Sequence, residues 1–514
     1  MEVALPSYSA NEPAIHRLVD DILAYIFLLN ATMTEHATTV ASSQVCTRWR
    51  SIALNYHTIW GRVIAYHRHP LKWIETLLDR SNPSSLDFGS RFNRAYLPES
   101  GPGSGQGVLE LVFNHIHRLR IFNVVLPVSS WELVCSRFLR LPAPNLEFVH
   151  IEVAGQSTHP LFDNHAPNLQ NLCLIQCTVD FTSPVLTSLT ELYVQKKFFF
   201  VKAYPTVLEW LNILGGMPSL RWVTLIRAIS SAPDNDICPV VHLCALEMLS
   251  VDGPSRESII LVDHLIVPPR CGLRLRCCGH LEFDQQRLWA IIGKKMDSWA
   301  KNAPNRRLEA SSTCDRSGNY HVAIGNLSEG LGAPWSTGAI EVKKGRYTSS
   351  SGVDPVMTIT LQLPRNQGSV SLLLSLFALF ERTFFDTTYL RLCFNYDRIH
   401  DRAEMYLPLV DIFRGFVNLE KLSLGYGERT SFPFPILQQA NSSVIFPDLK
   451  CIEFFGADFR EGSGTLIPIR DFLHWRRWQQ GFPVPKIEIQ EHHYLDMEYI
   501  LTYIEDTIVE ITNY

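Results

Sequence analysis

Four stretches of the sequence combine residue types that could bind a ligand or do chemistry. The glycine-rich run 101–107 precedes an expected helix, as a phosphate-binding loop does, but it lacks the closing Gly-Lys-Ser/Thr and no clear strand leads into it. Cys173 and Cys177, like Cys277-Cys278, have no second pair at the spacing of a zinc site. A metal ion could be coordinated by Glu491-His492-His493, although adjacent histidines on an exposed segment are usually solvated. We therefore interpret 101–107 as a flexible linker and Cys173 as part of a strand.

In the fourth stretch, Trp475 and Trp478 flank two arginines, as in some nucleic-acid-binding surfaces. The tryptophans also stand three residues apart, so they can pack inward from one helical face while Arg476 and Arg477 stay in water. We favour this interpretation because a formal net charge of −5 gives no electrostatic case for nucleic acid. Neither Gly-x-Ser-x-Gly nor His-Glu-x-x-His occurs in the chain. We expect no catalytic residue, no metal and no cofactor.

Two apolar stripes dominate the N-terminal part of the chain. Apolar residues recur every three or four positions from Ile15 to Phe27, as on one face of a helix, and a second stripe runs from Val45 to Ala53. Helices are expected at Ile15–Leu29, Glu35–Ser43, Val45–Leu54 and Leu71–Arg80, with Thr58-Ile59-Trp60 closing the first module. So short a module cannot bury both stripes within itself, and leftover apolar surface usually meets a partner.

The composition is that of an ordinary globular chain. With 46% hydrophobic and 19% charged residues, wholesale disorder is excluded, and 514 residues suffice for two or more domains. The first residues lack the parts of a secretory signal, and the most apolar run, 370–380, is about half as long as a membrane span. We expect a buried helix at 370–380, no membrane partner, and an intracellular protein of the cytoplasm, the nucleus or both. Because such a compartment is reducing, we interpret the twelve cysteines as small core residues and not as disulfides.

A different pattern begins near residue 108. Aliphatic residues recur as Leu-x-x-Leu-x-Leu, often just after Pro-Asn or Pro-Ser, and the early copies start 20 to 31 residues apart. Copies begin at Ile116, Leu146, Leu169, Leu189, Leu220, Leu246, Thr387, Leu419, Leu449 and Val484. Each copy predicts one strand whose inward side chains cannot be buried alone, so neighbouring units must stack. The expected fold is an α/β leucine-rich-repeat-like solenoid, with a parallel sheet on the concave side and helices outside. An unrelated α/β fold with leucine-rich strands is the alternative.

The repeat pattern breaks at about 276–365. A helix is expected at Asp284–Ala300, followed by strands at 320–324, 338–342 and 356–363 that are joined by Gly/Ser loops. We interpret this region as an irregular insertion that could form an antiparallel hairpin element. The predicted domains are a small all-α module at 14–61, a linker helix with a Gly/Pro-rich loop at 62–107, and the solenoid at 108–514.

The N-terminal residues resemble an F-box. That family opens with Leu-Pro-x-Glu-Ile/Leu-Leu-x-x-Ile-Phe, and continues with Val-Cys-x-x-Trp and a later tryptophan. This chain has Leu18-Val19-Asp20-Asp21-Ile22-Leu23-Ala24-Tyr25-Ile26-Phe27, then Val45-Cys46-Thr47-Arg48-Trp49, then Trp60. Val19 stands where the family has proline, and Asp21 stands where glutamate is usual. Proline is favoured in a first helical turn because its missing N–H would be unpaired there, so Val19 weakens the helix start but keeps the apolar surface.

The resemblance implies a three-helix unit that docks a Skp-type adaptor and so joins a cullin-based ubiquitin ligase, while a leucine-rich-repeat-like domain binds the protein substrate. The chain would be a non-catalytic substrate-receptor subunit. The adaptor-facing residues implied are Leu18, Ile22, Leu23, Ile26, Phe27, Val45, Cys46, Trp49, Ile52 and Ala53. Two alternatives stay open: a scaffold that binds the adaptor without ubiquitination, and an enzyme whose site lies in the 276–365 insertion.

Overall fold

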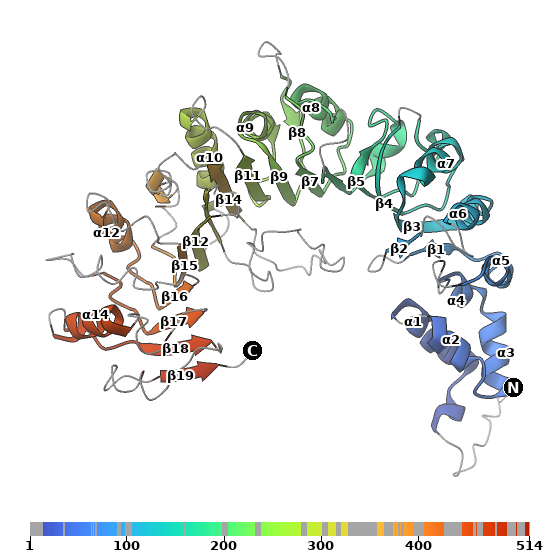
Figure 1. Cartoon of the computed structure of the whole chain (residues 1–514), viewed down its shortest axis with the longest axis horizontal. Helices are drawn as coiled ribbons and strands as arrows, with labels where there is room; N and C mark the ends of the chain where they lie inside the picture. The colour runs from blue at the N-terminus through green and yellow to red at the C-terminus, as the bar shows by residue number, and fades with distance from the viewer. Residues whose placement is uncertain are drawn as a thin grey trace, which may run out of the picture. The chain divides into compact units, whose positions relative to one another are not determined.

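The computed structural model divides the chain into two compact units (Figure 1). Unit 1 contains the described residues up to Tyr204 together with Ile213–Thr224, and unit 2 contains Pro205–Asn212 and the described residues from Leu225 onward. The described residues are 14–33, 36–62, 64, 66, 69–89, 94–97, 105–157, 160–197, 204–231, 238–278, 285–300, 307–314, 320–326, 357–363, 374–375, 377–378, 381, 385–394, 406–425, 445–455, 459, 466–478, 481–490, 500 and 509–512.

The N-terminal helices of unit 1 follow the predicted order. A single 3-10 turn, η1 (Ala14–Arg17), precedes α1 (Asp20–Met33), so the regular helix begins at Asp20 and not at Ile15. Asp20 and Asp21 occupy the first turn of α1, where carboxylates interact favourably with the helix N-terminus. The helices that follow are α2 (His36–Ser42), α3 (Thr47–Asn55), α4 (His57–Arg62) and α5 (Leu71–Arg80).

Trp60 and Gly61 on α4 join these helices to the first strand. The Trp60 indole N–H donates to the carbonyl oxygen of Ala53 at 2.8 Å, which closes α3 against α4. A Cβ atom on Gly61 would lie 2.3 Å from the carbonyl oxygen of Ser85, directly before β1 (Leu86–Phe88). Only glycine permits this close approach. The helical module therefore packs directly on the start of the sheet.

The sheet of unit 1 is parallel. Strand β3 (Leu119–Val125) pairs with β1, with β2 (Ala95–Tyr96) and with β4 (Phe148–Gln156). Strand β4 pairs with β5 (Asn171–Thr178), and β5 pairs with β6 (Glu191–Gln195). The prediction of a linker at 62–107 was wrong in part, because β1 and β2 lie inside that range. Both strands are too short to carry the leucine pattern.

The leucine pattern fixes the register of these strands. Val124 lies opposite Ile151, Ile151 opposite Leu174, and Leu174 opposite Val194, and all four side chains are buried. The pairing also shows that the first copy of the pattern begins at Leu119 and not at Ile116, since Phe122 aligns with Val149.

Helices α6 (Gly105–Phe113) and α7 (Trp131–Ser136) lie on one side of these strands (Figure 1). Between helices and strands a row of phenylalanines forms the core. The ring centroid of Phe138 lies 5.2 Å from that of Phe113, 4.1 Å from that of Phe122 and 5.3 Å from that of Phe162. This aromatic core extends to β1, where the Phe88 ring lies 5.4 Å from that of Phe122.

Elements α8 (Val207–Gly215) and β7 (Trp222–Ile226) each contain residues of both units. The helices of unit 2 include α9 (Ser255–Asp263), α10 (Gln285–Ala300), α12 (Tyr406–Arg414) and α14 (Leu466–Trp478). Its parallel strands include β9 (Met248–Pro254), β11 (Gly272–Cys278), β14 (Met357–Leu363), β12 (Arg307–Cys314), β15 (Tyr389–Phe394), β16 (Lys421–Gly425), β17 (Cys451–Phe455), β18 (Lys486–Gln490) and β19 (Val509–Thr512). A separate parallel pair joins β8 (Val241–His242) to β10 (Leu265–Ile266).

The predicted insertion contains an antiparallel element, as expected. Strand β13 (Tyr320–Asn326) pairs antiparallel with both β12 and β14. Strand β14 also pairs parallel with β11, and β12 pairs parallel with β15. The insertion therefore continues the sheet. The strand expected at 338–342 lies outside the described residues, as does most of the helix expected at 370–380.

Both units are thus α/β and built on largely parallel sheets, as the leucine pattern predicts. Strands occupy nine of the ten predicted copies of the pattern, and the copy predicted at Ile116 begins three residues later, at Leu119. Within the described residues, no helix combines the length and apolar character needed to cross a bilayer.

Candidate partner-binding surfaces

One side of α1 is both apolar and exposed. Its inward side buries Leu23, Ala24 and Phe27 against the other helices. Its outward side carries large apolar side chains at helical spacing, of which Tyr25 is 58% exposed. We call the exposed apolar set the α1 face, which consists of Val19, Ile22, Tyr25, Leu29 and the neighbouring Val45.

We include Val45 in this set because it lies three residues before Arg48, which anchors α3 to the start of α1. The guanidinium of Arg48 lies 2.7 Å from the carboxylate of Asp20 and also donates to the backbone carbonyl of Leu18. Cys46 caps α3, with its sulfur accepting from the backbone N–H of Trp49 at 3.4 Å. Val45 directly precedes this cap and is 62% exposed.

Trp49 is half-buried in this structure. Its ring centroid lies 5.0 Å from that of Phe27, at an interplanar angle of 59°. One side of the indole therefore packs on the bundle core, and the rest of the side chain remains partly accessible. A partner that contacts Trp49 would meet a side chain already held in place.

The adaptor-facing set expected from the resemblance divides in two. Leu23, Phe27, Ile52 and Ala53 are buried between the helices, so their side chains form the bundle core and are not available to a partner. Leu18, Ile22, Ile26, Val45, Cys46 and Trp49 are exposed or half-buried. The expected set omitted Val19, Tyr25 and Leu29. Tyr25 and Leu29 follow Ile22 by three and seven residues, so they lie on the same face of a helix as Ile22. This spacing was the sequence signal from which they could have been predicted.

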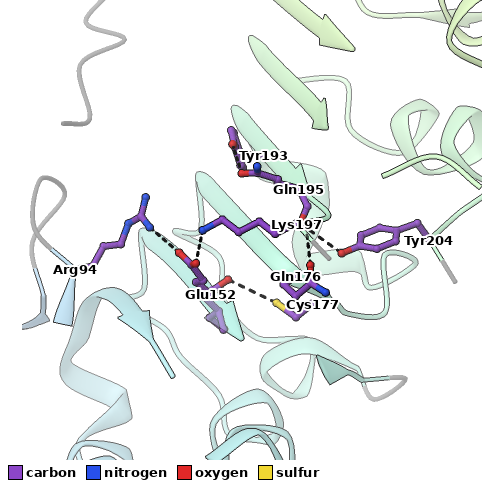
Figure 2. Close-up of polar contacts among 9 residues, drawn as sticks. Arg94, Glu152, Gln176, Cys177, Tyr193, Gln195, Lys197 and Tyr204 are labelled. Carbon is purple, nitrogen blue, oxygen red and sulfur yellow. Dashed lines mark hydrogen bonds and ion pairs between the residues drawn. The ribbon is translucent and has the colours of Figure 1, made fainter. Parts of the chain in front are cut away.

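A second surface joins β4, β5 and the end of β6 to Arg94, which directly precedes β2 (Figure 2). Glu152 on β4 accepts from two cations, with one carboxylate oxygen 2.6 Å from the Arg94 guanidinium and the other bound to the Lys197 ammonium. All three side chains are partly buried. We call these residues the Arg94–Glu152–Lys197 cluster. Two positive charges share one negative charge, so its net charge is +1.

Backbone geometry places Lys197 in this cluster. Gln176 on β5 has a φ of 63°, a left-handed conformation that is uncommon outside glycine. Its side-chain oxygen accepts the Lys197 backbone N–H at 2.6 Å, which holds the chain where it leaves β6. The Tyr204 hydroxyl donates to the carbonyl oxygen of Gln195 at 3.4 Å in the same region (Figure 2).

His150 lies two residues before Glu152 on the same side of β4. Burial, reinforced by the positive charges of Arg94 and Lys197, lowers the pKa of His150 to about 3. The imidazole is therefore neutral at physiological pH, and its Nε2 atom is buried without a hydrogen-bond partner. A neutral histidine adds no charge of its own to the cluster.

Unit 2 carries a larger ionic network across four neighbouring strands. Glu453 on β17 accepts from the Ser423 hydroxyl at 2.6 Å, from the Tyr389 hydroxyl at 2.9 Å and from the Lys421 ammonium at 2.8 Å. Lys421 also lies 2.7 Å from Glu488 on β18. Burial alone would raise the pKa of Glu453, but these donors outweigh it and lower the pKa. These contacts join neighbouring strands, so we interpret the network as part of what holds the sheet together.

The stretches that could do chemistry show no such site in the described part of the chain. No group of three His, Cys, Asp or Glu side chains there could hold a metal ion. Cys277 is fully buried, and burial raises its pKa well above the usual range, while burial and Asp252 raise the pKa of Cys278 to about 12. These thiols are protonated and inert. Glu491-His492-His493 and residues 101–104 lie outside the described residues. Residues 105–107 begin α6, so the expectation of a flexible linker was wrong there.

Helix α14 reverses the expected orientation of its aromatic and basic residues. Arg476 is 1% exposed, whereas Trp478 is 76% exposed. The guanidinium of Arg477 lies 5.5 Å from the Trp478 ring. The expectation that both tryptophans pack inward and both arginines stay in water was therefore wrong for Arg476 and Trp478.

Neither a protein-family model nor a curated protein matches this chain. The function proposed below therefore depends on the two surfaces described above and on the F-box resemblance of the N-terminal residues.

Proposed function

We propose that residues 14–61 form an F-box module that docks a Skp-type adaptor through the α1 face. The leucine-rich-repeat-like α/β units then bind a protein substrate, and the chain serves as the substrate receptor of a cullin-based ubiquitin ligase. The chemistry of ubiquitin transfer belongs to the partner subunits, so this chain supplies binding and positioning only.

The α1 face carries the proposal. Large apolar side chains gathered on one small surface mark a protein contact, because leaving them in water forgoes about 25 cal/mol for each Å² of apolar area that a partner would cover. Tyr25 is a favourable anchor, since aromatic side chains dominate binding energy in many interfaces. Trp49, fixed against Phe27, could supply a second anchor at the edge of the same surface.

A pair of matched variants tests the docking surface. The double variant Ile22→Asp/Val45→Asp places charges on the α1 face without removing core residues. We expect its dissociation constant for a purified Skp-type adaptor to rise about 100-fold or more, as for the loss of two interface anchors. Biolayer interferometry on the full chain measures this change.

Val128 supplies the control for that experiment. It is 63% exposed, almost the same as Val45 at 62%, and lies on η3 (Val128–Ser130) away from the α1 face. Val128→Asp should leave adaptor affinity unchanged. Equal affinity of the wild type and the α1-face variant would contradict the proposal. Co-purification of cullin with the adaptor distinguishes a ligase subunit from a scaffold that binds the adaptor alone.

A further inference from the structure

The Arg94–Glu152–Lys197 cluster holds more positive charge than its own carboxylate neutralises. Glu152 uses one oxygen for each cation, so among the described residues the two cations share a single carboxylate. Arg94 has five N–H donors in a planar fork, and its contact with Glu152 uses one of its terminal nitrogens. Partial burial makes the surplus charge more effective than the same charge in open water.

The sequence around the cluster is also basic. Residues 90–97 contain Arg91 and Arg94, and residues 193–203 contain Lys196, Lys197 and Lys202, while Glu99 and Glu191 lie just outside these stretches. The whole chain has a formal net charge of −5, so this local excess runs against the overall balance. Lys196 places its ammonium 5.6 Å from the Tyr204 ring, on the same edge of the sheet.

The cluster is held in place before any ligand binds. Gln176 fixes the backbone of Lys197, and Glu152 orients both cations from the strand between them. Preorganised cations lose little conformational entropy when an anion binds. The buried, neutral His150 beside them contributes no competing positive or negative charge at physiological pH.

We propose that Arg94 and Lys197 bind an acidic side chain, a carboxylate or a phosphate, on an extended segment of a protein partner. In the free protein the Glu152 carboxylate forms ion pairs with both cations and so takes the place of the partner's acidic group. A nucleic acid would call for cations spread along a whole face, and the overall negative charge disfavours it. The identity of the partner as a ligase substrate rests on the proposed function, but binding of the anion does not.

Four probes test the proposal on the full chain by isothermal titration at constant ionic strength. They are inorganic phosphate, acetylated tetraglutamate, a peptide of the same length with one phosphoserine, and tetraglutamine as the neutral control. The wild type should bind the acidic peptides and not tetraglutamine. Preference for phosphoserine over tetraglutamate would identify the acidic group as a phosphate, and the reverse would identify it as a carboxylate.

Glu152→Gln is the decisive variant. It removes the internal negative charge and raises the net charge of the cluster from +1 to +2, so phosphate and acidic peptides should bind about tenfold more tightly. Phosphate should also raise the melting temperature of this variant more than that of the wild type. A purely structural role for the cluster predicts the opposite pattern, in which Glu152→Gln loses stability and gains no anion affinity.

Arg94→Met/Lys197→Met should lose saturable binding of the acidic peptides, and circular dichroism establishes that it is folded. If the double variant is unfolded, Lys197→Met alone should weaken binding at least about fivefold. Lys72→Met changes an exposed lysine on α5 and serves as the control, which should bind as the wild type does.

Three results would overturn the proposal. The affinity of Glu152→Gln could equal that of the wild type, or the acidic peptides could still bind after both cations are lost. A ten-nucleotide single-stranded DNA could also bind more tightly than either acidic peptide. These measurements do not involve the adaptor, so they can be interpreted even if the α1-face experiment fails.

Discussion

Two buried arginines in this chain donate to backbone carbonyls. The Arg118 guanidinium donates to the carbonyl oxygen of Ser84 at 2.9 Å and to the Ser81 hydroxyl at 2.8 Å, which ties the 3-10 turn before β3 to the residues after α5. Arg476 does the same for α14 in unit 2. Its acceptors are the carbonyl oxygens of Pro483, Ile445, Phe446, Pro447 and Leu449. A guanidinium has enough donors in one plane to bind several carbonyls, which an ammonium cannot match.

The sequence could not indicate the burial of Arg476. An arginine side chain has a long apolar stem and a charged end, so on a helix it can occupy either a solvent-exposed or a buried position. Trp475 and Trp478 suggested the inward face by their type alone. Four of the five acceptors lie 27 to 31 residues away in the chain, and none carries a signal in its residue type, because all are backbone groups.

Arg476→Met tests the importance of these hydrogen bonds. Methionine keeps the apolar stem but leaves several buried carbonyls without donors, so we expect a loss of about 3 kcal/mol in the free energy of unfolding of unit 2. Urea denaturation, together with hydrogen exchange of α14 amides, measures it. Arg477→Met on the exposed side of α14 is the matched control and should change stability by less than about 0.5 kcal/mol. Equal stability of the two variants would contradict the assigned role of Arg476.

At the scale of helices and strands, the spacing of leucines predicted which faces of the strands are buried, whereas the spacing of apolar residues predicted helix α1 but not which of its sides is buried. Strands β4 to β7 and β15 to β18 lie where the leucine pattern predicts, because alternate positions on one face of a strand must be buried. Helix α1 is apolar on both sides, so its sequence could not separate Leu23 in the core from Ile22 on the surface. Strands β1 and β2 escaped prediction because two or three residues are too few to show a period.

The Glu453 network joins β15, β16, β17 and β18, and its stability should depend on pH. The donors around Glu453 lower its pKa in the folded state. The network therefore stabilises the fold fully at pH values above the ordinary glutamate pKa of about 4.3. This stabilisation is lost as the pH falls through the lower pKa of the folded state. The pKa of Lys421 is raised, so this ammonium stays charged throughout the acid range. We expect the stability of the wild type to fall steadily between about pH 5 and pH 3.

Glu453→Gln isolates this contribution. Glutamine can still accept from Ser423 and Tyr389, but it carries no charge for Lys421. The variant should be less stable than the wild type at pH 7, and the two stabilities should converge as the pH approaches 3. Urea midpoints measured at several pH values give the comparison. A constant difference across the whole range would show that the carboxylate charge is not what stabilises the network.

At the scale of the whole molecule, the chain does not divide where its sequence patterns change. The helical pattern ends near residue 61 and the leucine pattern begins near 108, which suggested a linker between two independent domains. The structure instead places the helices and the first strands in one compact unit. Gly61 against Ser85 and Arg118 against Ser81 and Ser84 make this connection. These interactions join residues that are far apart in sequence, so no local pattern predicts them.

Truncation tests whether the sheet needs α5 and its first two strands to be complete. A fragment of residues 108–514 lacks β1 and α5, so it uncovers the side of β3 that Phe88 and Leu86 cover in the full chain. Exposing a buried aromatic or leucine side chain to water costs about 1.5–3 kcal/mol, and an uncovered strand edge promotes association between chains. We expect this fragment to aggregate on size-exclusion chromatography, and a fragment of residues 57–514, which keeps α4, α5, β1 and β2, to elute as a folded species. A monodisperse 108–514 fragment with a melting temperature equal to that of 57–514 would mean that the sheet is complete without its first two strands.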